Sequence, residues 1–344
     1  MISKIKEIYF SAKEKKSSLI NKYLDYHNSK LIMPLIFAGL FYVIAICLAL
    51  FTKHIFYFFN FMYIGTALGI GLFLNISLKK KYISWARRIT QFMIGFYMLV
   101  FVGFILRENI QIEGFVLYLF SGIFTGAVLH YIIAKIIGPI VFNRGWCGWA
   151  CWTAAILDVL PWKDPPRNRE KKLEKLPYIS FSLSMLVVLL IWFIIIDRNM
   201  EHVQKTALYG MIAGNLIYYI LGVVLAFILK DNRAFCKYLC PIAVIMKVTA
   251  RFSLLKIGFY RKRCTECGLC ELKCPMNIKH MEYKNKGTRI FSTECILCCT
   301  CIDICPEKAL NMKFRFDARL PEEQKTSEKS ADKTFEENNQ GENA

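Results

Sequence analysis

The sequence predicts an α-helical membrane protein of about six transmembrane helices, followed by a small C-terminal α+β domain that is rich in cysteine. Two observations predict this architecture. Hydrophobic residues make up 55% of the 344-residue chain, above the roughly 45–50% that is usual for a soluble domain, and long uncharged stretches lie between residues 31 and 229. Fourteen cysteines are present, and most of them lie in closely spaced runs within or after this apolar region.

Six stretches are long and apolar enough to be transmembrane helices, which need about 20 mostly apolar residues. They lie at residues 31–51, 55–78, 89–106, 114–134, 177–196 and 207–229. The third stretch is short, and the fourth ends ambiguously around Lys135 and Pro139. We therefore expect a transmembrane domain over residues 31–235, preceded by a basic N-terminal segment, residues 1–30.

Basic residues alternate between the loops of this domain. Lysine and arginine are frequent in residues 1–30 and in the loops after the second and fourth stretches, whereas the intervening loops carry few or mixed charges. Loops rich in lysine and arginine stay in the cytoplasm. This pattern predicts that both termini are cytoplasmic, and it explains the net charge of +19 without a nucleic-acid partner.

The C-terminal region contains the motif C-x₂-C-x₂-C-x₃-C-P twice, 31 residues apart. This is the pattern of bacterial two-cluster ferredoxins, in which the fourth cysteine of each run ligates the other cluster. The spacing therefore predicts two [4Fe–4S] clusters in a ferredoxin-like α+β domain. One would be held by Cys264, Cys267, Cys270 and Cys305, and the other by Cys295, Cys298, Cys301 and Cys274.

Structural zinc fits these runs less well, because zinc sites usually pair two separated C-x₂₋₄-C units. Cys299, which lies between two expected ligands, is expected not to be a ligand. Thiolate ligation favours a reducing compartment, in agreement with the cytoplasmic orientation that the loop charges predict. We place the ferredoxin domain at residues 263–316 and expect a disordered polar tail at residues 317–344.

Two further cysteine pairs have C-x₃-C spacing, Cys147 with Cys151 and Cys236 with Cys240, the second followed by Pro241. Residues at i and i+4 share one face of a helix, and each pair follows a stretch that ends at the cytoplasmic side, so the four thiols are expected to converge. Three interpretations stay open: a further metal or cluster, redox-active dithiols, or inert buried thiols. Residues 236–262 are expected to form the second motif and an amphipathic linker.

Residues 140–310 resemble the polyferredoxin-type membrane iron–sulfur proteins, among them the quinol-dehydrogenase membrane component of periplasmic nitrate reductase and the membrane protein that supports nitrous-oxide reductase. The resemblance is carried by the order of four elements: the motif from Asn143 to Cys151, two apolar stretches, the Cys236–Pro241 motif and the eight ferredoxin cysteines. Trp152 stands where the family usually has proline. The resemblance implies electron transfer between the quinone pool or cytoplasmic carriers and a partner protein, in a bacterial inner membrane.

Two ionisable residues lie in or near the fourth apolar stretch, His130 and Lys135. Ionisable residues inside a membrane are candidates for function. We expect Lys135 to extend its ammonium group to the cytoplasmic face, and His130 is a candidate for contact with a quinone headgroup.

The sequence therefore predicts a membrane-bound iron–sulfur protein that relays electrons between cytoplasmic clusters and a membrane-level redox partner or quinone pool. It would be an electron-transfer component of an oxidoreductase system, with a flavoprotein, ferredoxin or reductase subunit as partner, and no catalytic residue is assigned. The alternative is a redox sensor or maturation factor for a membrane or extracytoplasmic metalloenzyme, or a metal-ion reductase.

Overall fold

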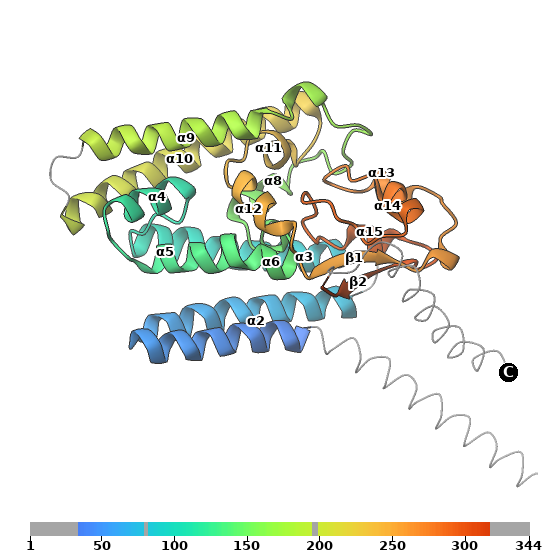
Figure 1. Cartoon of the computed structure of the whole chain (residues 1–344), viewed down its shortest axis with the longest axis horizontal. Coiled ribbons are helices and arrows are strands. Elements are labelled where there is room, and N and C mark those ends of the chain that lie inside the picture. Colours follow the sequence, from blue (N-terminus) through green and yellow to red (C-terminus); the bar gives the residue numbers. More distant parts are fainter. Residues whose placement is uncertain (1–33, 79–81, 195–198, 317–344) are drawn as a thin grey trace, which may run out of the picture. The chain divides into compact units, whose positions relative to one another are not determined.

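The computed structural model describes residues 34–78, 82–194 and 199–316, which form helices and one small sheet (Figure 1). The chain divides into two compact units, residues 1–90 and 91–344. Within the described residues, five helices are long and apolar enough to cross a membrane: Pro34–Thr52, Ile55–Ser77, Ser84–Ile105, Lys171–Ile194 and Glu201–Leu229. The expected basic segment 1–30 and the expected polar tail 317–344 lie outside the described residues.

The first unit contains the helix Pro34–Thr52, helix α2 (Ile55–Ser77) and the first part of α3 (Ile83–Phe96). The rings of Phe41 and Phe61 stack between the first two helices, with their centroids 6.5 Å apart. A Cβ at Gly71 of α2 would overlap the side chain of Thr90 in α3. A small residue therefore permits these two helices to pack closely.

The fourth expected span is not a single helix. Helix α4 (Ile112–Phe120) ends in a reversal at Gly122, which has a φ of +67°, and a second helix then runs from Gly126 to Phe142. This second helix combines α5 (Gly126–Tyr131), the π-helical segment η2 (Ile132–Ile137) and α6 (Gly138–Phe142). The expectation of one continuous span at 114–134 is therefore wrong, and the part of the chain that the structure describes has five long apolar helices.

Helix α4 begins inside the helix bundle rather than at its edge. The chain leaves the π-helical segment η1 (Tyr97–Ile105) and turns back along α10 (Met200–Leu229). Asn109 donates to the carbonyl of Ala207 at 2.9 Å, while Glu113, in the first turn of α4, accepts from Tyr218 about three turns farther along α10. The amino end of α4 therefore points toward the interior of the membrane domain.

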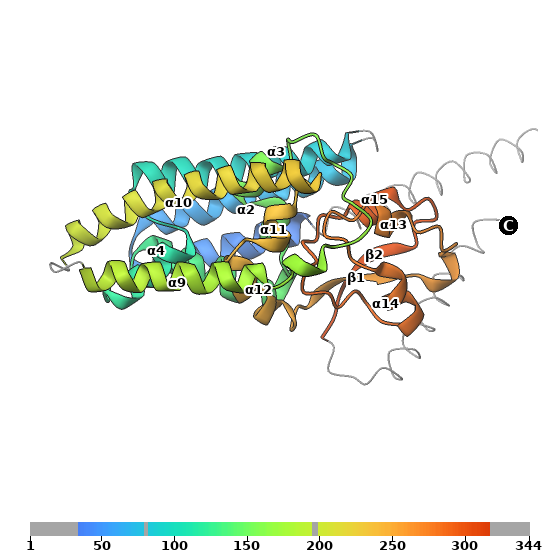
Figure 2. The same cartoon turned by 90° about the horizontal axis from the view of Figure 1, so that it is seen from above.

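Four short helices carry the C-x₃-C motifs: α7 (Gly145–Trp149), α8 (Trp152–Leu157), α11 (Ala234–Tyr238) and α12 (Ile242–Ala250). Of these, α11 and α12 lie between the long helices α9 (Leu176–Ile194) and α10 and the C-terminal domain (Figure 2). Non-glycine residues with positive φ mark the backbone reversals before both motifs, Asn143 at 50° and Lys230 at 51°. A 3₁₀ turn at Lys171–Leu173 precedes α9.

The ferredoxin domain contains a two-stranded antiparallel sheet, in which Ile257 of β1 (Leu255–Phe259) pairs with Met312 of β2 (Leu310–Phe314). The 3₁₀ turn Arg261–Arg263 and three short helices lie between the strands: α13 (Leu269–Leu272), α14 (His280–Lys286) and α15 (Thr300–Ile304). The expected amphipathic linker extends only to Ala250, where α12 ends. Residues 255–259 are buried in the sheet instead, so the domain begins earlier than residue 263.

Candidate iron–sulfur and thiol sites

The first expected cluster set lines one cavity in the ferredoxin domain. Its cysteines, called the outer set here, are Cys264, Cys267, Cys270 and Cys305. Positive φ angles at Glu266 and Gly268 turn the loop so that three of the four cysteines face the same space. The amide of Ala309 lies 3.3 Å from the Cys305 sulfur, the type of hydrogen bond that tunes cluster potentials. These residues fit a cubane.

The second expected set lies deeper in the same domain. The cysteines of this inner set are Cys274, Cys295, Cys298 and Cys301. Burial raises the pKa of Cys274 to about 11 and that of Cys295 to about 12, and the neighbouring thiol of Cys298 contributes to both shifts. Free thiolates are therefore disfavoured here, and the positive charge of bound iron would stabilise them.

The two sets differ in their access to solvent. In the outer set Cys267 is exposed and only Cys270 is buried, whereas in the inner set only Cys298 is partly exposed. Cys299 is buried, and its sulfur lies 3.3 Å from the Leu297 carbonyl oxygen and 3.9 Å from the Met312 sulfur. Within the described residues, no three His, Cys, Asp or Glu side chains surround the position of a single metal ion.

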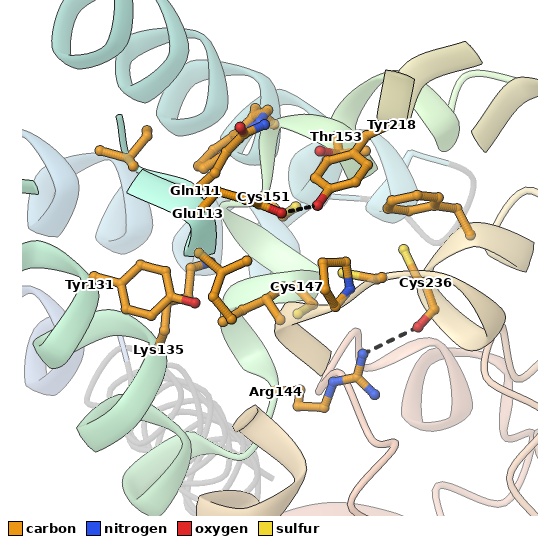
Figure 3. Close-up of a pocket in the computed structure, with 17 residues that line it drawn as sticks. Gln111, Glu113, Tyr131, Lys135, Arg144, Cys147, Cys151, Thr153, Tyr218 and Cys236 are labelled. Atoms are coloured by element: carbon orange, nitrogen blue, oxygen red, sulfur yellow. Dashed lines mark hydrogen bonds between the residues drawn. The ribbon is translucent and has the colours of Figure 1, made fainter. Parts of the chain in front are cut away.

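The four C-x₃-C cysteines line a second cavity, which we call the thiol cavity (Figure 3). The sequence predicts that these thiols converge, and the structure brings them to one cavity. The Cys147 sulfur also lies 3.7 Å from the sulfur of Met246. The other polar residues that line the cavity are Gln111, Glu113, Tyr131, Lys135, Arg144, Thr153 and Tyr218.

The inner set lies directly against the first C-x₃-C motif. The indole Nε1 of Trp149 donates to the Leu297 carbonyl at 2.9 Å, and the amide of Arg144 donates to the Cys295 carbonyl at 3.3 Å. A Cβ at Gly148 would overlap the carbonyl oxygen of Ile296. The loop of the inner set and the backbone of the motif are therefore in contact, and only a glycine permits this distance.

A partly buried carboxylate, Glu294, joins the two regions. Its Oε2 lies 2.6 Å from Nη1 of Arg144, and its Oε1 lies 2.6 Å from Nζ of Lys247 and 3.5 Å from Nη1 of Arg169. Burial alone would raise the pKa of Glu294, but these three cations lower it to about 2. Glu294 is therefore ionised at neutral pH and connects the membrane domain to the residue before Cys295.

Several residues of the thiol cavity were not identified from the sequence. Gln111 and Glu113 come from the loop and first turn of α4, and their position depends on contacts with distant helices: Glu113 Oε1 lies 2.7 Å from Ser184 Oγ of α9. Lys135 is 5% exposed and lines the cavity, so the expectation that it extends to the cytoplasmic face is wrong. Its position in an apolar stretch had already marked Lys135 as a candidate for function.

His130, the other ionisable residue of the fourth stretch, does not line the thiol cavity. Its ring is buried with an edge-on contact to Trp146, at a centroid distance of 5.1 Å. Trp152, at the family's proline position, begins α8 and donates from Nε1 to Asn215 at 2.9 Å.

Comparison with known families assigns iron–sulfur binding to two parts of the chain. Residues 256–306 match the family described as a 4Fe-4S dicluster domain. Residues 125–172 and 215–260 match the family described as a 4Fe-4S binding domain. The first region contains both ferredoxin sets, and each segment of the second contains one C-x₃-C pair. No solved structure matches the chain.

The chain is also similar to curated proteins, one of them uncharacterized and two named as ferredoxin-type or electron transport proteins. The chain is 29% identical over 244 residues to the uncharacterized protein MJ0749 of Methanocaldococcus jannaschii, covering 70% of this chain and 90% of the relative. It is 27% identical over 204 residues to the ferredoxin-type protein NapH of Haemophilus influenzae, covering 56% and 68%. It is 25% identical over 195 residues to the putative electron transport protein YccM of Escherichia coli, covering 52% and 54%. The cysteine pattern, the apolar helices and these relatives together identify the chain as a ferredoxin-type membrane iron–sulfur protein related to NapH and YccM.

Proposed function

We propose that this membrane iron–sulfur electron-transfer protein relays single electrons between its ferredoxin domain and the thiol cavity of its membrane domain. The observation that carries the proposal is the contact between the loop Cys295–Cys298 and the motif Cys147–Cys151, where Gly148 meets the Ile296 carbonyl and Trp149 bonds to Leu297. Closely packed covalent and hydrogen-bonded paths support a short transfer distance between the two sites.

The proposal assigns the outer set, Cys264, Cys267, Cys270 and Cys305, to one [4Fe–4S] cluster and the inner set, Cys274, Cys295, Cys298 and Cys301, to the other. Such clusters supply one-electron chemistry when bound. The residues of this chain hold the iron, exclude water from the inner set and adjust its charge through nearby amides and the ion pairs of Glu294.

The difference in exposure supports an order for the relay. The outer set has an exposed cysteine, so a soluble partner would exchange electrons there, and the inner set would pass them to the membrane side. A flavoprotein, a ferredoxin or a reductase subunit would fit the one-electron step. The proposed orientation, with the clusters and both termini in the cytoplasm, rests on the positive-inside pattern and agrees with the helix Gly126–Phe142 returning the chain to the ferredoxin side.

At the membrane end we propose that Cys147, Cys151, Cys236 and Cys240 hold a further iron–sulfur cluster. Four thiols on one cavity next to the inner set support this over inert thiols, and redox-active dithiols are the competing chemistry. The decisive measurement is iron and sulfide analysis with EPR on anaerobically purified, reduced protein. About twelve irons per chain would support the further cluster, and about eight would leave the pairs as dithiols or inert thiols.

A quinone is a second candidate at this end, and Gln111 favours it. Its side chain is 6% exposed and, within the described residues, neither its Oε1 nor its Nε2 has a hydrogen-bond partner, although it lines the thiol cavity at the amino end of α4. A carbonyl oxygen could accept from such an amide. Quinol added to the purified protein should then reduce the clusters, and Gln111→Leu should weaken that reduction while Asn75→Leu in α2, outside the cavity, should not.

The alternative classes give different results. A redox sensor or maturation factor would change its binding of a partner on oxidation but show no sustained electron turnover. A metal-ion reductase would reduce an added metal ion in proportion to the electrons supplied by the reduced clusters. Orientation is tested by reporter fusions: those after residues 53 and 110 should report the outside, and those after residues 83 and 165 the inside.

A further inference from the structure

The thiol cavity contains one buried cation that the proposed relay does not use, the ammonium group of Lys135. The side chain belongs to η2, a π-helical segment within the apolar helix Gly126–Phe142. Single π-helical turns occur frequently at functional sites, because the extra residue changes which side chains share a face. Figure 3 places Lys135 and Tyr131 on one side of the cavity and Cys236 on the other.

Other buried cations in this region have carboxylate partners. The pairs, with N–O distances of 2.5–2.6 Å, are Arg144 with Glu294, Arg233 with Asp158, and Lys237 with Asp231. Lys135 differs from them, because among the residues that the structure describes no carboxylate lies within ion-pair distance of its Nζ. The cavity carboxylate, Glu113, is held instead by Ser184 and Tyr218.

Two tryptophan rings border the ammonium group. Its Nζ lies 4.6 Å from the ring centroid of Trp146 and 5.9 Å from that of Trp152. Cation–π contacts of this kind offset only part of the free energy that burial of a charge costs. A buried ammonium group therefore needs an anion, and the four thiols of Cys147, Cys151, Cys236 and Cys240 line the same cavity as Lys135.

We propose that Lys135 is the counter-charge of an anionic iron–sulfur centre held by Cys147, Cys151, Cys236 and Cys240. A cubane with four thiolate ligands is an anion in both of its oxidation states, and it becomes more negative when it takes one electron from the neighbouring inner cluster, which is oxidised in the same step. A fixed cation beside it stabilises the reduced form more than the oxidised form. Lys135 thereby raises the potential of the centre and favours electron flow toward the membrane.

This inference rests on the proposed further cluster, and the experiment separates the two. Redox titrations followed by EPR would compare the full chain in detergent with Lys135→Met, Lys135→Arg and the control Lys247→Met. Lys247 is a cation of the same region that pairs with Glu294 and does not line the thiol cavity. We expect Lys135→Met to shift the potential of the cavity centre to more negative values, and Lys135→Arg to restore most of the shift. Lys247→Met should leave that centre unchanged.

Three results would overturn the assignment. About eight irons in the unaltered chain would remove the centre, and with it both the further cluster and the counter-charge. About twelve irons with an unchanged potential in Lys135→Met would leave the cluster standing and refute the role of Lys135. If Lys135→Met loses the centre altogether, the arginine variant decides between shape and charge. Loss of the centre in Lys135→Arg as well would show that the shape of the lysine side chain is required rather than its charge. Retention of the centre in Lys135→Arg would support the counter-charge.

Discussion

Arg144 and Arg233 each donate a hydrogen bond to a backbone carbonyl in the motif of the other arginine, that of the first cysteine of the C-x₃-C pair. Arg233 Nη1 lies 3.0 Å from the Cys147 carbonyl oxygen, and Arg144 Nη2 lies 3.5 Å from that of Cys236. Each arginine precedes the first cysteine of its own motif by three residues. The two R-x-x-C-x₃-C segments are therefore linked by reciprocal hydrogen bonds, which hold the four thiols around one cavity.

This reciprocity predicts a large effect of Arg233→Gln. The guanidinium also forms a two-point ion pair with Asp158, with Nε–Oδ1 and Nη2–Oδ2 distances of 2.7 and 2.5 Å, and both residues are buried. Removing one partner of a buried pair costs about 3–5 kcal/mol. We expect the thermal unfolding temperature in detergent to fall clearly, with loss of any iron bound at the thiol cavity.

Two variants control this prediction. Arg169→Gln removes a partly exposed arginine, and Glu294 keeps its contacts with Arg144 and Lys247, so we expect little change. Arg233→Met combined with Asp158→Leu removes the charge pair as a whole. This double variant should recover much of the thermal stability but not the hydrogen bond to the Cys147 carbonyl. An Arg233→Gln protein as stable as the unaltered chain would show that the buried contacts of Arg233 do not stabilise the fold.

Gly148 tests the junction between the two halves of the proposed relay. A Cβ at this position would overlap the Ile296 carbonyl oxygen, so Gly148→Ala should displace the loop of the inner set at a cost of roughly 1–3 kcal/mol. We expect EPR of the reduced protein to show an altered or partly lost inner cluster and an unchanged outer one. In the control Gly210→Ala the nearest atom, Asn109 Nδ2, lies 3.7 Å away, so both signals should persist. Equal spectra for all three proteins would contradict the contact.

The sequence predicts the convergence of the thiols because short-range spacing carries that information. Cysteines at i and i+4 share a face, and equivalent positions after two spans bring both pairs to the same side. The reversal at Gly122 is not predictable in this way, because residues 114–134 are as apolar as a true span. The start of α4 is held by long-range contacts instead: Glu113 accepts hydrogen bonds from Ser184 and Tyr218, which no local pattern specifies.

The position of Lys135 was mispredicted for a related reason. Near the end of a span a lysine usually extends to water, but here the rings of Trp146 and Trp152, from the folded C-x₃-C motif, enclose it. Likewise residues 255–259 have mixed composition, and their role as a buried strand depends on pairing with residues 310–314. Contacts between distant segments determine both outcomes.

Cys299 provides a test of the ligand assignment. Its sulfur contacts the Leu297 carbonyl and the Met312 sulfur, so Cys299→Ala should lose about 1 kcal/mol of stability or less and keep its full iron content. Alanine has the same Cβ as cysteine, so the strain of the positive φ of 61° does not change. Cys298→Ala, at the neighbouring proposed ligand, should instead lose the inner cluster. Iron and sulfide analysis of both variants decides the matter, and loss of iron in Cys299→Ala would make Cys299 a ligand.

We expect His280 to make the ferredoxin domain sensitive to pH. Burial lowers its pKa below the ordinary value of 6.5, and the hydrogen bond to the Ile278 carbonyl, at 2.8 Å, and the charge of Glu271 oppose this only in part. The folded state therefore prefers the neutral ring, while the unfolded chain binds a proton below pH 6.5. The stabilisation is fully present above pH 6.5 and is lost as the pH falls below it, by up to about 1.4 kcal/mol per pH unit.

Replacing His280 by glutamine keeps a hydrogen-bond donor and removes this titration. We expect the unaltered chain to lose resistance to denaturant between about pH 7.5 and about pH 5.5 more steeply than His280→Gln does, because only the unaltered chain takes up the extra proton on unfolding. The measurement is the denaturant concentration that removes half of the cluster absorbance. His202→Gln, at an exposed histidine of α10, should follow the unaltered chain, since acid lability of the clusters is common to all three proteins. Parallel curves for the unaltered chain and His280→Gln would show that the buried ring does not control the pH dependence.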